Sequence, residues 1–280
     1  MKKAYLFPNV ITAFGLACGL FVILKVSLSF QGEGYYEVLH TSAILLLVAA
    51  LLDVLDGVVA RLVRGESEFG AIFDSLADVV NFGVAPAILM IKSFPIPADS
   101  HLLFFAMTGA MIYTICGVLR LVRFNVKANA AKLDPELAHA HKANFIGLPI
   151  PAAAAAAVSL NLFLVSSDFV RWVTISDETR AWILIVAMII LGYFMVSRWK
   201  FPSIKTVNFR LSSFYLVLLV AIGAVLLLFG ILHHFAFVFA GGAWLYIIAA
   251  WTLSIIRLII GRKSATLVEF EPEPDDDETI

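Results

Sequence analysis

Four aspartates stand inside otherwise apolar segments of this sequence, in the stretch LDVLDGVVARLVRGESEFGAIFDSLADVV that runs from residue 52 to residue 80. A charged carboxylate in the middle of a membrane helix costs about 2.5–3.5 kcal/mol, so Asp53, Asp56, Asp74 and Asp78 together cost on the order of 10 kcal/mol unless they are compensated. The compensation could come from ion pairs with arginines, from a proton pathway or from bound cations.

The spacing of these aspartates places their side chains close together. Asp53 and Asp56 share one face of a helix, and Gly70, Asp74 and Asp78 form a stripe along the next helix. In an antiparallel hairpin the two pairs meet at similar depth, ~12–20 Å from the turn. Four carboxylates without as many buried bases need cations, and ligands that are all oxygen favour Mg²⁺, Mn²⁺ or Ca²⁺. Two such ions would suit an enzyme that acts on phosphates.

The residues beside the aspartates suit a phosphate group. Gly57 and Gly70 lack side chains and leave room for a phosphate to approach the cations. Arg61 lies five residues after Asp56, near the expected cytoplasmic mouth of the site. There it either binds a phosphate through two nitrogens or is an ordinary interfacial arginine.

Membrane helices must position these residues. The 280 residues are 61% hydrophobic and 15% charged, whereas soluble domains are usually about 25% charged. Apolar runs of membrane-spanning length recur along the chain, which predicts an all-α, polytopic membrane helical bundle. We expect eight transmembrane helices, over residues 7–28, 38–62, 69–91, 102–123, 146–166, 181–199, 211–232 and 235–257.

The basic residues predict that both termini are cytoplasmic. Lys25, Lys92, Arg171 and Arg180 fall at one side of the expected spans, and the other 16 of the 20 basic residues fall at the opposite side. The site then opens toward the cytoplasm. We expect a single catalytic transmembrane domain over residues 1–263 and an acidic, disordered cytoplasmic tail over residues 264–280.

The aspartate stretch resembles the signature of the CDP-alcohol phosphatidyltransferase family at all eight specified positions, in the pattern Asp53-x-x-Asp56-Gly57-x-x-Ala60-Arg61-x8-Gly70-x-x-x-Asp74-x-x-x-Asp78. The resemblance implies that Asp53, Asp56 and Asp74 ligate two divalent cations, Mg²⁺ or Mn²⁺ with Ca²⁺ as a further option. It also implies that Asp78 is both a metal ligand and the catalytic base. The segment FPNVIT is similar to the start of many members of the family. The CDP diphosphate would then contact Gly57, Ala60, Arg61, Gly70, Asn9 and Thr12.

Three further segments resemble the phosphatidylserine synthase branch of this family: VVNFGVAPA from residue 79, LRLVRFNV from residue 119 and HKANFIGLPIPAAAA from residue 141. The similarity spans roughly residues 7 to 205. It implies transfer of the phosphatidyl group from CDP-diacylglycerol to the L-serine hydroxyl, with release of CMP, by a homodimer in the cell membrane of a bacterium or archaeon. The residues expected to bind the acceptor or the lipid phosphate are Asn81, Arg120, Arg123, Asn125 and Lys142.

Two alternatives stay open at this point. The acceptor could be glycerol 3-phosphate or an inositol phosphate, or the donor could be an archaeal ether lipid. The protein could instead be a cation transporter, although the carboxylates cluster at one end of the membrane rather than being spaced across it.

Overall fold

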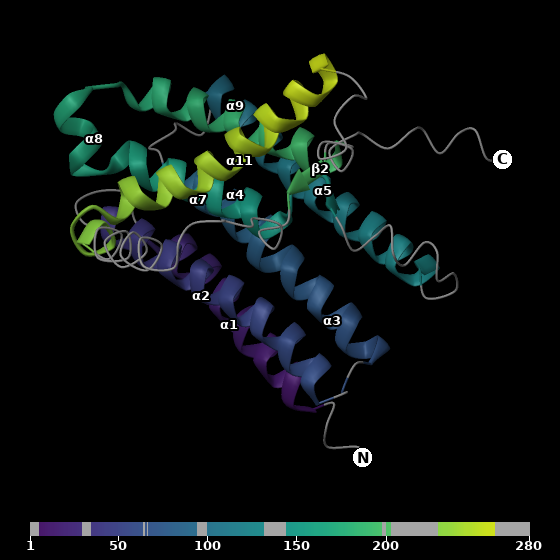
Figure 1. Cartoon of the computed structure of the whole chain (residues 1–280). Coiled ribbons are helices and arrows are strands. Elements are labelled where there is room, and N and C mark those ends of the chain that lie inside the picture. Colours follow the sequence, from purple (N-terminus) through teal and green to yellow (C-terminus); the bar gives the residue numbers. More distant parts are fainter. Residues whose placement is uncertain are drawn as a thin grey trace, which may run out of the picture.

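The computed structural model describes residues 6–29, 35–63, 65, 67–93, 100–131, 144–197, 200–202 and 229–260. These residues form a bundle of helices (Figure 1), six of which are long and apolar enough to cross a membrane. The six are α1 (Leu6–Leu28), α2 (Tyr35–Leu62), the continuous helix Glu68–Lys92, α5 (His101–Ala131), α9 (Asp177–Val196) and α11 (Phe235–Ile260). The predicted all-α membrane fold is therefore confirmed.

Shorter elements connect and complete these helices. Helix α7 (Ile150–Val165) has 16 residues and lies where a span over 146–166 was expected. It leads into α8 (Ser167–Trp172). Strands β1 (Asn144–Ile146) and β2 (Lys200–Pro202) form a small antiparallel pair that the sequence did not predict. The expected span over 211–232 lies outside the described residues except for 229–232, which are helical, so the count of eight spans stays a prediction.

Helix α1 supports the hairpin that carries the aspartates. It packs along α2 and contacts every segment of the third span. Its buried positions recur every three or four residues, as one face of a helix requires, and they are Pro8, Thr12, Gly15, Gly19, Val22 and Val26. The two glycines permit a close approach, since a Cβ atom on Gly19 would overlap the side chain of Asn81 in the third span.

The third span is not one regular helix. It consists of α3 (Glu68–Asp78), a π-helical turn η1 (Val79–Val84) and α4 (Ala85–Lys92). Pro86 explains the interruption, because proline has no amide hydrogen and its ring clashes with the carbonyl group four residues earlier. A wider π-helical turn relieves that clash. The sequence predicted one continuous span over residues 69–91 and did not predict this turn.

Helix α7 provides the small surface around which other helices pack. It contacts α2, α4, α9 and α11. Most of its alanine run is buried, including Ala153, Ala154, Ala156 and Ala157. Small side chains let neighbouring membrane helices approach closely, so the alanine run allows α7 to pack tightly against these helices.

Candidate active site

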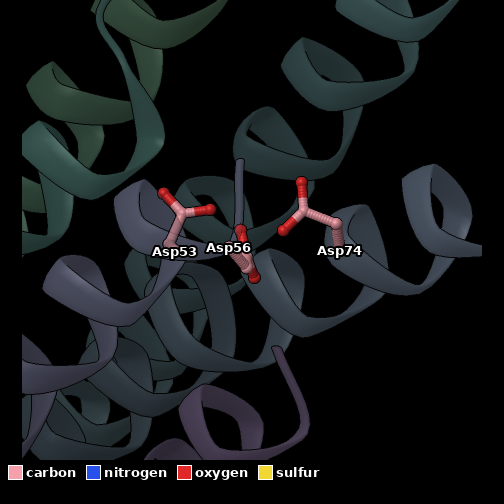
Figure 2. Close-up of side chains that lie close together, drawn as sticks. All are labelled: Asp53, Asp56 and Asp74. Carbon is pink, nitrogen blue, oxygen red and sulfur yellow. The ribbon is translucent and has the colours of Figure 1, made fainter. Parts of the chain in front are cut away.

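Three of the four aspartates form one compact group. Asp53 and Asp56 extend from α2, and Asp74 extends from α3 toward them (Figure 2). One carboxylate oxygen from each side chain lies within 4.8 Å of the others. The i, i+3 spacing on α2 and the short connection to α3 bring them together, as the sequence predicted. Asp56 is buried, whereas Asp53 and Asp74 are half-buried.

Two side chains fix the local geometry around this group. The hydroxyl of Thr12 lies 2.6 Å from Oδ2 of Asp56, to which it donates, and 3.2 Å from the carbonyl oxygen of Pro8. The shorter contact orients the Asp56 carboxylate. At the start of α3, the Ser67 hydroxyl accepts a hydrogen bond from the amide of Gly70 at 3.0 Å. This N-cap satisfies an amide that the first helical turn would leave unpaired and fixes where α3 begins.

A cavity of about 580 Å³ adjoins the carboxylates, within the roughly 300–1,000 Å³ of small-molecule sites. Asp56 and Asp74 line it. The same cavity is lined by all six residues that were expected to contact the CDP diphosphate, namely Asn9, Thr12, Gly57, Ala60, Arg61 and Gly70. Residues from α1, α2 and α3, together with Phe124 of α5, thus converge on one cavity.

Asp78 lies one turn beyond Asp74, outside the group of three. Its carboxylate is within electrostatic range of the Arg120 guanidinium on α5, and of the other aspartates. Arg120 is only 8% exposed, and its Nε atom has no hydrogen-bond partner in the described part of the chain. A buried guanidinium with an unused donor, facing a carboxylate, is suited to hold an anionic substrate group between the two helices.

Two of the other expected acceptor residues, Arg123 and Asn125, make hydrogen bonds to other helices or their ends. Arg123 donates from Nη1 to the carbonyl oxygen of Val196 at 3.0 Å and from Nη2 to that of Ser197 at 3.3 Å, at the end of α9. Asn125 donates to the hydroxyl of Ser75, beside Asp74, at 2.9 Å.

Asn81 is buried against Gly15 and Gly19 of α1, and its Oδ1 atom has no partner among the described residues. Lys142 lies outside the described residues. Among the expected acceptor residues that the structure describes, Arg120 is therefore the one whose guanidinium lies within electrostatic range of Asp78.

Three residues near the site were missed by sequence reasoning. Ser67 could have been found, because a serine before a helical pattern is a common N-cap. Tyr113 on α5 bonds to the π-helical turn, and Tyr246 on α11 is within electrostatic range of Arg120. No spacing pattern relates Tyr246 to the aspartates, so nothing in the local sequence could have indicated it.

A helical membrane bundle that gathers carboxylates beside a polar cavity defines a membrane-embedded enzyme suited to phosphate chemistry. Comparison with known families specifies the class. Residues 5–193 match the sequence model described as CDP-alcohol phosphatidyltransferase, and the chain belongs to that family. The matched region contains the aspartates and the cavity, whereas α11 lies beyond it.

Curated relatives carry the name CDP-diacylglycerol–serine O-phosphatidyltransferase. The chain is 34% identical to the protein of that name from Helicobacter pylori over 266 residues, which cover 95% of this chain and 99% of the relative. It is 31% identical to the Bacillus subtilis protein over 200 residues, covering 71% of this chain and 90% of the relative. It is 35% identical to the Methanocaldococcus jannaschii protein over 177 residues, covering 61% and 68% respectively.

Proposed function

We propose that this protein transfers the phosphatidyl group of CDP-diacylglycerol to the hydroxyl of L-serine and releases CMP. The observation that carries the proposal is the convergence of the Asp53, Asp56 and Asp74 group with a cavity lined by all six residues expected to contact CDP. The relatives' shared name supports serine as the acceptor. Serine also explains a cationic side chain at the site, since Arg120 could pair with its carboxylate.

The group of three carboxylates fits divalent cations. It offers only oxygen ligands, which Mg²⁺ and Mn²⁺ prefer. In the described part of the chain, ion pairs join Arg180 to Asp177 and His234 to Asp168, and neither pair involves the three carboxylates. We therefore propose Asp53, Asp56 and Asp74 as ligands, with Asp78 as a further ligand to a second ion. When bound, such ions polarise the diphosphate and stabilise the charge of the departing CMP.

The chain's own residues divide the remaining work. Asp78 accepts the proton of the serine hydroxyl. The serine oxygen forms a bond to the phosphorus that carries diacylglycerol, and the bond from that phosphorus to the CMP oxygen breaks. Arg120 holds the serine carboxylate beside Asp78, so that the hydroxyl faces the phosphorus. Arg61 binds the diphosphate at the cavity wall.

Other proposed acceptor residues act less directly. Asn81 lies one turn beyond Asp78 and is proposed to orient a polar group of the acceptor. Arg123 and Asn125 hold α9 and α3 in place through their hydrogen bonds. Lys142 remains a proposed anion-binding residue.

We further propose that residues 1–263 form one catalytic domain with its site facing the cytoplasm, and that residues 264–280 form a tail. We also propose that the enzyme is a homodimer in the cell membrane.

The test is a product assay with purified protein, CDP-diacylglycerol and Mg²⁺ or Mn²⁺. Serine, glycerol 3-phosphate and an inositol phosphate are offered separately, CMP release is measured, and the lipid product is identified by mass. We expect phosphatidylserine as the product, and EDTA should abolish its formation until metal is restored. A phosphatidylglycerol phosphate product would contradict serine as the acceptor, and full activity in EDTA would contradict the metal site. Cation flux in liposomes without CMP release would favour a transporter instead.

A further inference from the structure

The π-helical turn η1 begins directly after Asp78 and is bonded to α5. The hydroxyl of Tyr113 donates to the carbonyl oxygen of Phe82 at 2.8 Å. The hydroxyl of the next residue, Thr114, lies 3.2 Å from the carbonyl oxygen of Gly83. Tyr113 is 0% exposed, so its hydroxyl has no access to water as an alternative partner. The Thr114 hydroxyl has one proton and lies nearer, at 2.9 Å, to the carbonyl oxygen of Ala110 in its own helix. The Tyr113 bond is therefore the main side-chain bond from these two residues to the backbone of the turn.

The Tyr113 bond compensates for a proline. In an α-helix the carbonyl group of Phe82 accepts a hydrogen bond from the amide of residue 86, four positions later. That residue is Pro86, which has no amide hydrogen. An unpaired buried carbonyl group costs free energy comparable to a lost hydrogen bond. The Tyr113 hydroxyl donates to this carbonyl group from another helix.

The same bond sets the register between α5 and the third span. Asp78 precedes Phe82 by four residues, and Arg120 follows Tyr113 by seven, so in antiparallel helices both lie on the same side of the bond. The separations along the helix axes are ~6 Å and ~10 Å, a difference that the long arginine side chain can span. Tyr113 and Arg120 also share one face of α5, two turns apart. Anchoring Phe82 to Tyr113 therefore places Asp78 opposite Arg120.

We propose that Tyr113 is a positioning residue for the transfer reaction, holding the π-helical turn against α5 so that Asp78 faces Arg120. The inference rests on the proposed function, in which Asp78 accepts the proton and Arg120 holds the acceptor. Tyr113 acts through the Phe82 carbonyl group and does not contact substrate. Without its hydroxyl, the turn loses its anchor at a position one helical turn from the proposed base.

The experiment compares Tyr113→Phe with Tyr193→Phe in the purified full-length protein. Tyr193 lies on α9, is 61% exposed, and makes a ring contact with Phe194, so Tyr193→Phe is the matched control. Rates are measured with whichever alcohol the wild-type protein uses best, together with KM for CDP-diacylglycerol and Tm. Tyr113→Phe should lower kcat about 10- to 100-fold, because a displacement of about 1 Å costs about 100-fold. KM for the donor should stay close to the wild-type value, since the donor cavity is built from α1, α2, α3 and the turn between α2 and α3, and α5 contributes only Phe124.

A second variant tests whether Tyr113 positions the turn or only provides a hydrogen bond to the Phe82 carbonyl group. Adding Pro86→Ala to Tyr113→Phe restores an amide donor for Phe82 and should recover Tm, but not kcat, because an α-helical bond there removes the π-helical turn. Recovery of both quantities would overturn the proposal, as would a wild-type kcat in Tyr113→Phe.

Thr114→Val tests the same turn if Tyr113→Phe does not fold. It removes the hydroxyl that lies 3.2 Å from Gly83 in the turn and 2.9 Å from Ala110 in α5. It should lower kcat without changing KM for the donor, whereas an unchanged kcat would overturn the proposal. A wild-type protein that prefers an alcohol other than serine would refute only the proposed acceptor, since the variants are measured on the reaction it does catalyse.

Discussion

Gly57→Ala separates substrate binding from folding. A Cβ atom at this position would have Arg61 Nη1 as its nearest neighbour, at 3.6 Å, which is an ordinary van der Waals contact. Alanine within a helix is more stable than glycine by roughly 0.5–1 kcal/mol. The variant should therefore keep or raise the Tm of the protein. Gly70→Ala would be less informative, because its Cβ atom would lie 3.0 Å from Asn9 Oδ1 and 3.1 Å from Ser67 Oγ, which requires those side chains to shift.

The same methyl group should obstruct the donor. Gly57 lines the cavity next to Asp56, so the added methyl occupies the space proposed for the diphosphate. If it displaces the phosphorus by about 1 Å, kcat/KM for CDP-diacylglycerol should fall about 100-fold. The assay measures initial rates of CMP release against donor concentration, beside thermal unfolding in the same detergent.

Gly242→Ala is the matched control for this prediction. It lies on α11, and its Cβ atom would meet nothing within 4 Å, so it adds the same methyl without approaching the cavity. We expect it to leave kcat/KM unchanged. A stable Gly57→Ala protein with wild-type kcat/KM would refute the placement of the diphosphate beside Gly57.

Two further predictions concern the carboxylates. Thr12→Val removes the 2.6 Å hydrogen bond to Asp56. It should weaken Mg²⁺ or Mn²⁺ binding about 10- to 100-fold, as loss of a ligand's hydrogen-bond partner typically does. Titration of activity with metal measures this change, and the control Thr12→Ser should retain tight metal binding. Asp78→Asn should lower the rate ~10²–10⁴-fold while CDP-diacylglycerol still binds, whereas Asp53→Asn should weaken metal and donor binding together. Binding isotherms beside turnover assays distinguish these results, and near-normal turnover of Asp78→Asn would show that the base lies elsewhere.

The membrane helices and the carboxylate group were predictable because both depend on local repeats. Apolar runs of about 20 residues mark spans wherever they occur. The i, i+3 spacing of Asp53 and Asp56 puts them on one face of α2, and the short turn before α3 lets Asp74 reach that face. The expected cavity residues followed for the same reason, since most of them belong to this one hairpin.

The contacts that Arg120 and Arg123 make in the folded chain were not predictable from local sequence spacing. Arg120 and Arg123 are three residues apart at the end of one span and had the same expected role. In the folded chain Arg120 is buried near Asp78, while Arg123 bonds to the carbonyl groups that end α9, 73 and 74 residues away. The rotation of α5, which packs against α9, α4 and η1, decides between these outcomes.

The sequence by itself thus determined that this is a helical membrane protein, which hairpin carries the acidic site, and which residues share its helix faces. These properties follow from the α-helical period and from the cost of exposing backbone and charge to lipid. The tertiary structure alone decided that Thr12 donates to Asp56, 44 residues away, and that Tyr113 donates to the carbonyl group of Phe82, 31 residues away. Such pairs depend on the depth and rotation at which helices pack, and those are set by the shapes of all their side chains together rather than by any local pattern.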